Sequence, residues 1–387
     1  MTEEQGRITP QAAPWAMLYL ALCATSGRAA DAEAVEAMDL GAVLACAKRQ
    51  ELVACVFEAL KPFAHREELF RGSLPRWEHE RKLALRRSLL FESEFVAVRD
   101  FLEANGIPYM PLKGITLAPL YPAPHLRDMS DVDIWYDKTH RDRLVAFFGQ
   151  RGYSWESIGN HDIFTKPPIY NFEMHTALFS SVTEADFANY YMHFEDKMQK
   201  NDSGCGYHFR AEDTYIYLIL HEYRHAKEGG VGVRYLLDRY RFALAHPALD
   251  GAYIERELAR VGALDYRRDT EALIAWLFAD PARIFCEGEG GHMTTLCAEF
   301  LFVGVHGSYD RKLEQELRRA SGGERITRRG RLRWMWGRLF PSRDFMRYYA
   351  AHHCPRAFRP LPLAYLYRIL RAVGKAPRLL RRARSVK

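Results

Sequence analysis

The order of structural signals between residues 107 and 175 limits the fold of this chain more than any other feature. Three segments there are short and apolar, or alternate between apolar and polar side chains as strands do: 107–112, 131–136 and 170–175. Residues 115–120 and 141–151 have the spacing of helices instead. This strand–helix–strand–helix–strand series predicts a small mixed sheet with helices packed on it.

Helical periodicity dominates on both sides of this segment. Residues 34–60 are predicted to form a helix with a weak point at Gly41, and residues 81–104 form another that ends at Asn105-Gly106. Five more helices are predicted near the C-terminal side: 211–227, 231–245, 251–263, 267–279 and 293–304. The expected fold class is therefore α+β. Its predicted parts are an N-terminal helical region (1–105), a small mixed-sheet core (106–205), a C-terminal helical domain (206–320) and a basic helical tail (321–387).

Three carboxylates fall on the predicted strands. Side chains two residues apart on a strand share a face, so Asp131 and Asp133 project together while the apolar residues beside them point into the core. Adjacent carboxylates repel unless a cation lies between them, and Mg²⁺ prefers carboxylate oxygens together with substrate phosphates. Glu173 lies on the polar face of its own strand with Asn171 and His175. If the two strands are neighbours, Asp131, Asp133 and Glu173 form a site for two metal ions about 4 Å apart.

A phosphate-binding turn is predicted just upstream of these carboxylates. Gly114 stands where a strand turns into a helix, and a glycine there lets backbone N–H groups approach a phosphate. Lys113 and Arg127 could add phosphate contacts. Taken singly, each of these two cations is more simply explained as a solvated surface charge.

These motifs together resemble a known family, the uncharacterised bacterial nucleotidyltransferases of the DNA polymerase beta superfamily. The resemblance rests on Leu112-Lys113-Gly114, Tyr121-Pro122, the run from Arg127 to Ile134, and Glu173-Met174-His175, and it extends to His221, Arg234, Leu237, Asp238 and Leu339-Phe340-Pro341-Ser342. It implies a nucleotidyltransferase core and transfer of a nucleoside monophosphate from a nucleoside triphosphate, dependent on Mg²⁺ or Mn²⁺. By this resemblance, Asp131, Asp133 and Glu173 are the metal ligands and catalytic residues.

The chain departs from the family pattern at the phosphate turn. Ile115 follows Gly114 where the superfamily usually has Gly or Ser, and the hydroxyl comes one residue later, at Thr116. This leaves open an enzyme with an unusual donor, or an inactive nucleotide- or RNA-binding regulator that kept the fold. The acceptor also stays open: a small molecule, a peptide, a protein or an RNA.

A second motif competes with this interpretation. His221-Glu222-Tyr223-Arg224-His225 has the H-E-x-x-H spacing that places two histidines on one helical face, where they can bind zinc in a hydrolase. Arg224 puts a cation inside the motif, and no third histidine follows at metzincin spacing. Alternatively, His221 or His225 lines a cleft with Arg234 and Asp238, where Arg234 could hold triphosphate oxygens, or these residues form buried pairs that brace two helices.

Charge is distributed unevenly along the chain. The net charge is +6, yet residues 324–387 contain 18 Lys and Arg residues against two acidic ones, so the rest of the chain is acidic. This tail interleaves arginines with Trp334 and Trp336, which allows contact with nucleic acid, with acidic lipid or with the protein's own acidic surface. The seven cysteines are interpreted as reduced apolar residues, and the chain as cytoplasmic, with the tail able to place it at a membrane surface.

Overall fold

The structure is a computed structural model that divides into two compact units, residues 1–306 and 307–387. It describes residues 8–181, 184–286 and 291–302 of the first unit. Of the second it describes residues 317–318, 320–322, 325–340, 343, 346–347, 350 and 354–370. The mixed α+β fold predicted from the sequence is confirmed, with one five-stranded sheet between helical regions.

The N-terminal helices surround one fully buried helix. Every residue from Trp15 to Thr25 of α1 (Ala13–Ser26) is buried, as expected for a helix that is apolar on all sides. The single helix predicted over residues 34–60 is wrong, because the chain forms α2 (Ala32–Glu36), α3 (Leu40–Gln50) and α4 (Val53–Leu60). Asp39 starts α3 by accepting hydrogen bonds from the N–H groups of Gly41 and Ala42, and Glu51 ends it with a positive φ of 52°.

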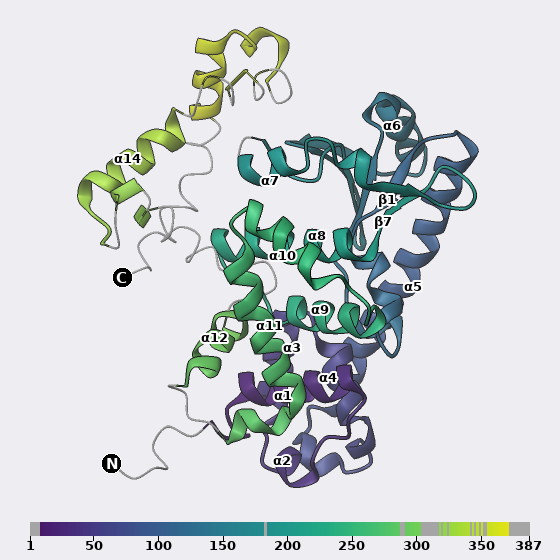
Figure 1. Ribbon diagram of the computed structural model, residues 1–387, viewed down its shortest axis with the longest axis vertical. Helices are drawn as coiled ribbons and strands as arrows, with labels where there is room; N and C mark the ends of the chain where they lie inside the picture. The colour runs from purple at the N-terminus through teal and green to yellow at the C-terminus, as the bar shows by residue number, and fades with distance from the viewer. Residues whose placement is uncertain are drawn as a thin grey trace. The chain divides into compact units, whose positions relative to one another are not determined.

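A long helix joins these N-terminal helices to the sheet. α5 (Leu74–Ala104) begins with Pro75 in its first turn and is followed by Gly106 at a φ of 63°. Its first half places Trp77 and Ala84 in the core of the N-terminal helices, whereas its second half places Phe91 in the core beneath the sheet. Figure 1 shows α5 extending between the two regions. Both cores therefore share one rigid element.

The sheet has the strand order β1-β2-β5-β4-β3, in which the β2–β5 pair is parallel and the other pairs are antiparallel. The three predicted strands appear as β1 (Tyr109–Pro111), β2 (Val132–Tyr136) and β5 (Tyr170–His175). The helix predicted over residues 141–151 is α6 (Arg141–Gln150). Residues 115–120 instead fall in two 3₁₀ turns, Gly114–Thr116 and Ala118–Leu120, and a third spans Pro124–Leu126. The sequence did not predict β3 (Ser154–Ile158), β4 (His161–Lys166) or the hairpin of β6 (Met198–Lys200) and β7 (Tyr207–Phe209).

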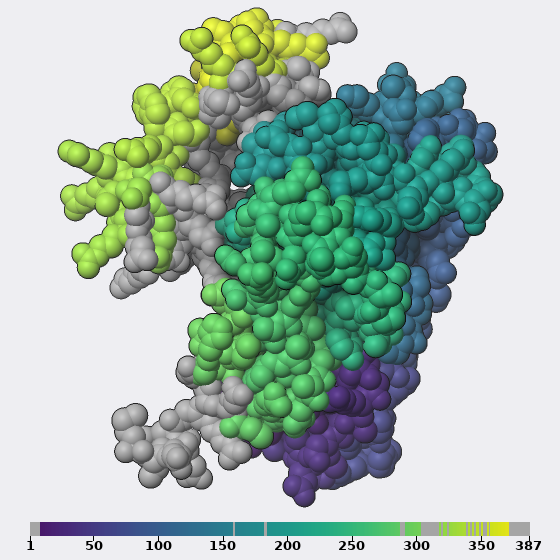
Figure 2. Space-filling model, in the orientation of Figure 1, coloured from purple at the N-terminus to yellow at the C-terminus, as the bar shows by residue number. Residues whose placement is uncertain are grey.

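The C-terminal helices of the first unit return to the N-terminal ones. They are α8 (Ala211–Glu228), α9 (Arg234–Ala245), α10 (Gly251–Arg260), α11 (Leu264–Ala279) and α12 (His292–Leu301), preceded by the short α7 (Ala185–Tyr190). Leu236, Leu273 and Cys297 share a core with α1 and α4. In Figure 2 this green part of the chain packs directly on the purple N-terminal part. Residues more than 200 positions apart thus form one hydrophobic core.

The second unit is described by itself. It contains α14 (Arg328–Leu339), a 3₁₀ turn at Arg356–Phe358 and helical residues 361–370, around a small core of Met346, Ala350, Cys354 and Ala364. The predicted tail features at Pro341, Ser342 and residues 371–387 lie outside the described residues. Within the described part of the chain, no helix combines the length and the apolar composition needed to cross a bilayer.

Candidate active site

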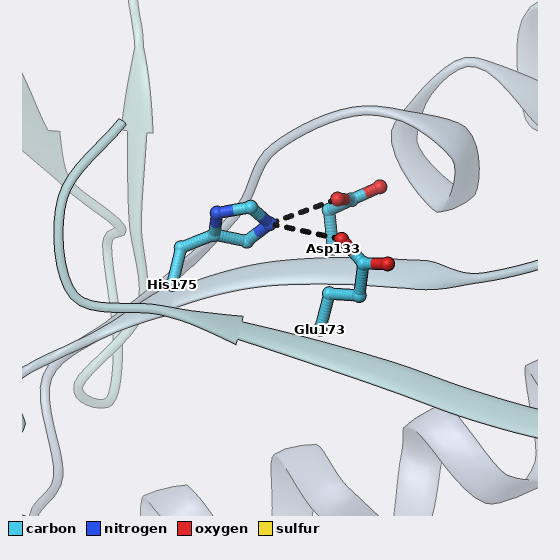
Figure 3. Close-up of side chains that lie close together, drawn as sticks. All are labelled: Asp133, Glu173 and His175. Carbon is cyan, nitrogen blue, oxygen red and sulfur yellow. Dashed lines mark hydrogen bonds and ion pairs between the residues drawn. The ribbon is translucent and has the colours of Figure 1, made fainter. Parts of the chain in front are cut away.

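The parallel pairing of β2 with β5 sets the geometry of the site. In this register Asp133 lies directly beside Glu173. The residues that alternate with them are fully buried in the core beneath the sheet: Val132, Ile134, Phe172 and Met174. The predicted alternation on both strands is therefore present in the structure. Figure 3 shows the two carboxylates close together, as predicted.

His175 joins the two carboxylates, and the sequence prediction did not include it among the site residues. Its Nε2 atom lies 2.9 Å from Oδ1 of Asp133 and 3.9 Å from Oε2 of Glu173. Potential ligand atoms of the three residues all lie within 4.8 Å of one another. One octahedral ion with bonds of about 2.1 Å places its ligands about 3 to 4 Å apart, so the group fits a divalent cation. The available signal was that His175 stands two residues after Glu173, on the same strand face.

Asp131 lies just before β2 and lines a cleft together with Asp133, Lys113 and Gly114. Burial raises the pKa of Glu173, and the negative charges of Asp133 and Asp131 raise it further. Asp131 therefore contributes to the electrostatic field of the cluster even though the three tightly grouped ligand residues are Asp133, Glu173 and His175. Such mutual repulsion between carboxylates is what a bound cation would relieve.

Lys113 already supplies one positive charge. Its Nζ atom lies 3.0 Å from Oδ2 of Asp133. Burial opposes the charge of Lys113, but Asp133 and Asp131 together raise its pKa above the ordinary value. Burial likewise opposes ionisation of Asp133, but the charge of Lys113 and the hydrogen bond with His175 hold its pKa well below the usual range. The pair is thus fully ionised at neutral pH.

Gly114 occupies a position that requires glycine. Its φ is +60°, and a Cβ atom there would lie 3.4 Å from Sδ of Met129 and 3.6 Å from Nη1 of Arg127. The residue opens the first 3₁₀ turn, next to Lys113 and inside the cleft. Thr116, predicted to contribute its hydroxyl, is exposed and is not among the residues that line the cleft.

The two predicted arginines hold the loop that precedes Asp131. Arg127 donates from Nε and Nη2 to the two oxygens of Asp238 on α9, at 2.8 Å each, and the Tyr121 hydroxyl donates to the same carboxylate at 2.7 Å. Arg234, at the start of α9, donates to Glu51 at 2.7 Å and to the backbone carbonyl of Asp128 at 3.0 Å. Both guanidinium groups line the cleft. Because both guanidinium groups already have protein partners, nucleotide contact by Arg127 or Arg234 stays a prediction.

The comparison with protein families decides which class these residues belong to. Residues 36–279 match the model of a family described as uncharacterised nucleotidyltransferase. The chain belongs to this nucleotidyltransferase family. The matched range includes the whole five-stranded sheet and the helices α8 to α11, so it covers the carboxylates and the α9 contacts that hold their loop. No curated protein and no solved structure matches the chain. The bacterial origin and the wider assignment to the DNA polymerase beta superfamily stay predictions.

The H-E-x-x-H segment of this family member does not have the arrangement of a zinc site. Nη2 of Arg224 lies 3.1 Å from Nε2 of His221 and 2.6 Å from Nε2 of His225, so the arginine stands where zinc would bind. Glu222 is fully buried, accepts a hydrogen bond from the Tyr266 hydroxyl at 2.8 Å and pairs with a buried arginine of α9. An imidazole nitrogen that accepts a hydrogen bond carries no proton, so the Nε2 atoms of both histidines are unprotonated when Arg224 donates to them. His221 also lines the cleft that contains Asp133.

Proposed function

We propose that this protein transfers a nucleoside monophosphate from a nucleoside triphosphate to an acceptor and releases pyrophosphate. The observation that carries the proposal is the side-by-side register of Asp133 and Glu173, with Asp131, Lys113 and Gly114 at the adjoining cleft. Family membership supports the same class of reaction. Carboxylates gathered beside a glycine turn and a lysine are suited to a nucleotide that carries a divalent cation.

The donor set fits such a cation. Asp133 and Glu173 offer the oxygen ligands that Mg²⁺ and Mn²⁺ prefer, and His175 adds a nitrogen within reach of the same position. Asp131 adds a third carboxylate at the adjoining cleft. When bound, a divalent ion would neutralise charge on the phosphates and polarise the α-phosphate toward attack.

The side chains mainly position charge. Gly114 lets the backbone of the first 3₁₀ turn approach the phosphates, and Lys113 supplies a buried positive charge beside them. Asp133, held from both sides by Lys113 and His175, has a fixed orientation before substrate arrives. An acceptor oxygen attacks the α-phosphorus. The bond from that phosphorus to the oxygen that bridges the α- and β-phosphates breaks, and pyrophosphate leaves with the electron pair. No covalent enzyme intermediate is needed, and catalysis consists of positioning and charge neutralisation.

Pyrophosphate release tests the proposal. The protein is incubated with each of four nucleoside triphosphates, Mg²⁺ or Mn²⁺, and cell extract as a source of acceptors. The control is the Asp131→Ala/Asp133→Ala variant. Release that requires both the metal and the aspartates would establish the transferase. If the protein bound nucleotide independently of the aspartates and released no pyrophosphate, the inactive nucleotide-binding regulator would be the better description.

A further inference from the structure

A second histidine lies beside the carboxylate pair, on the neighbouring strand β4. In the antiparallel register His161 stands directly opposite His175, so both side chains lie on the sheet face that carries Glu173. The Nε2 atom of His161 lies 3.9 Å from Oε2 of Glu173, and Nε2 of His175 approaches the same oxygen at 3.9 Å. The centroids of the two rings are 5.1 Å apart. Glu173 therefore has an imidazole on each of two adjacent strands.

These distances suit the ligands of a single divalent ion, which lie about 3 to 4 Å apart. The Nε2 atom of His175 also lies 2.9 Å from Oδ1 of Asp133, whereas Lys113 contacts the other oxygen of that carboxylate. Figure 3 shows the ring of His175 turned toward both carboxylates. The side chains of His161 and Glu173 are 22% and 24% exposed, so an ion from solvent can reach them. Contacts thus link two carboxylates and two imidazoles around one accessible position.

Neither ring is locked in the tautomer that would prevent metal binding. The Nε2 atom of His175 donates its hydrogen to Asp133, because an ionised carboxylate can only accept. A metal ligand needs the lone pair of that nitrogen, so the hydrogen of the neutral ring must then lie on Nδ1. The Nδ1 atoms of His161 and His175 are buried, and neither has a hydrogen-bond partner among the described residues. No donor at Nδ1 therefore forces the hydrogen onto Nε2.

We propose that His161 and His175 supply nitrogen ligands to the ion held by Asp133 and Glu173, and that the site therefore prefers a first-row transition-metal ion over Mg²⁺. The inference rests on the proposed function, because it concerns the cation of that same site. Mg²⁺ prefers a shell of oxygen atoms and usually keeps several waters. Imidazole nitrogen instead favours first-row transition-metal ions. A site with two nitrogen and two oxygen ligands separates these two classes of ion.

Pulsed electron paramagnetic resonance of Mn²⁺ bound to the unaltered full chain tests the nitrogen ligands without a substitution and without nucleotide. Directly bound imidazole is expected to give hyperfine coupling between Mn²⁺ and ring nitrogen. Isotopic labelling of the histidine nitrogens should change that coupling, which identifies its source. Bound Mn²⁺ without nitrogen coupling would overturn the proposal.

Titration calorimetry with Mn²⁺ and with Mg²⁺ separates a ligand from a merely structural residue. His161→Gln and His175→Gln should each weaken Mn²⁺ binding at least as much as loss of an outer-shell partner does, about tenfold, and should affect Mg²⁺ much less. Glutamine at position 175 keeps an N–H group for Asp133. His193→Gln, at an exposed position outside the cluster, is the matched control and should change neither affinity. Equal losses for the two ions would indicate a structural role and would overturn the proposal.

The failure of this inference can be distinguished from the failure of the transferase function. Nitrogen-coupled Mn²⁺ in a protein that never releases pyrophosphate would support the metal preference while the transferase function failed. Pyrophosphate release by a protein that binds Mg²⁺ as tightly as Mn²⁺ and shows no nitrogen coupling would support the transferase and overturn the preference.

Discussion

Asp133 is the most enclosed of the three carboxylates, and its side chain is only 2% exposed. Lys113 contacts one of its oxygens and His175 the other. A buried charge in this situation depends on its partners, because removing one partner leaves the other charge without compensation. The two partners also explain why the carboxylate can be ionised without a metal ion.

Lys113→Met is therefore expected to destabilise the protein by about 3 kcal/mol, because it leaves Asp133 buried with only the histidine beside it. The double variant Lys113→Met/Asp133→Asn should recover much of this loss, since it removes the uncompensated charge as well. Urea unfolding of the two single variants and the double variant measures the coupling. Strictly additive losses would show that the two side chains do not depend on each other.

Metal binding should depend on pH through Glu173. Burial and the charges of Asp133 and Asp131 raise the pKa of this carboxyl above its ordinary value, so it holds a proton at pH values where an exposed glutamate has lost its own. That proton must leave before the oxygen can bind a cation. Apparent Mn²⁺ affinity, measured by calorimetry, is expected to rise with pH above the ordinary glutamate pKa of about 4.3 and then level off.

The variant Glu173→Gln isolates this contribution. It should bind Mn²⁺ more weakly, and the part of the pH dependence that belongs to Glu173 should disappear. An unchanged slope in the variant would contradict the prediction.

Alternation along two strands was enough to predict that Asp133 and Glu173 lie side by side, whereas the roles of Asp131, Asp133 and Glu173 in metal binding stay predictions. The interactions that orient these side chains could not be predicted from the sequence. His175 shares a face with Glu173, but nothing in a single sequence shows that its ring reaches Asp133 across two strands. Lys113 was predicted as a phosphate contact, whereas its ion pair with Asp133 depends on the β1–β2 pairing. The sequence alone does not show whether a lysine is exposed to solvent or paired with a buried carboxylate.

At the level of elements, α9 holds the loop that carries Asp131. The Arg127–Asp238 pair is bidentate and both side chains are less than 10% exposed, and Arg234 fixes the carbonyl of Asp128 next to it. The 3₁₀ turns of residues 114–126 lack the long hydrogen-bonded ladders of regular elements, so side-chain contacts determine their position. The helical part of the chain therefore contributes directly to the geometry of the site.

Asp238→Asn tests this contribution. It removes the charge that Arg127 needs, and it is expected to lower the free energy of unfolding by about 3 to 5 kcal/mol. Mn²⁺ affinity should fall several-fold as well, because the loop before Asp131 loses its anchor. Asp269→Asn, on an exposed position of α11, is the control and should change neither quantity. Normal Mn²⁺ binding in a destabilised Asp238→Asn protein would limit the role of the pair to folding.

The elements that sequence reasoning missed have a physical explanation. β3 contains Ser154, Glu156 and Ser157 and exposes Trp155, so it has no apolar alternation, and it is stable as an edge strand paired along its length with β4. β4 buries Asp162 in an interaction with the Tyr136 hydroxyl, so a polar residue stands where an apolar one is expected. Tertiary pairing, rather than local pattern, creates both strands.

In the first unit as a whole, α5 links the core of the N-terminal helices to the core beneath the sheet. It contributes Trp77 and Ala84 to the helical core and Phe91 to the core beneath the sheet. The helices that return after the sheet pack on α1, and α9 reaches from that core to the Asp131 loop. The site therefore depends on contacts between segments that are distant in sequence. Local patterns predicted its strands, but they could not predict the contacts of α9 with the loop before Asp131.

The basic second unit leads to a prediction about the whole molecule. Its described surface exposes Leu332, Met335 and Trp336 on α14, among four exposed arginines. Cations interleaved with apolar and aromatic side chains bind polyanions by charge and add contacts to bases or lipid. We expect the chain to bind single-stranded RNA or vesicles containing phosphatidylserine at low salt, with an affinity that falls steeply as salt increases, because counterions screen the contacts.

Replacement of Arg328, Arg329, Arg331 and Arg333 by glutamine should weaken this binding at least tenfold at roughly 50 mM salt. The charge-matched control replaces four exposed arginines of the first unit with glutamine: Arg71, Arg99, Arg256 and Arg268. Fluorescence anisotropy measures binding to labelled RNA, and co-sedimentation measures binding to vesicles. If the tail binds only RNA, the protein stays in the supernatant with neutral and with anionic vesicles. Equal losses in both variants would mean that net charge alone drives the association. Binding to neither partner would favour a tail whose aromatic side chains pack against the protein itself.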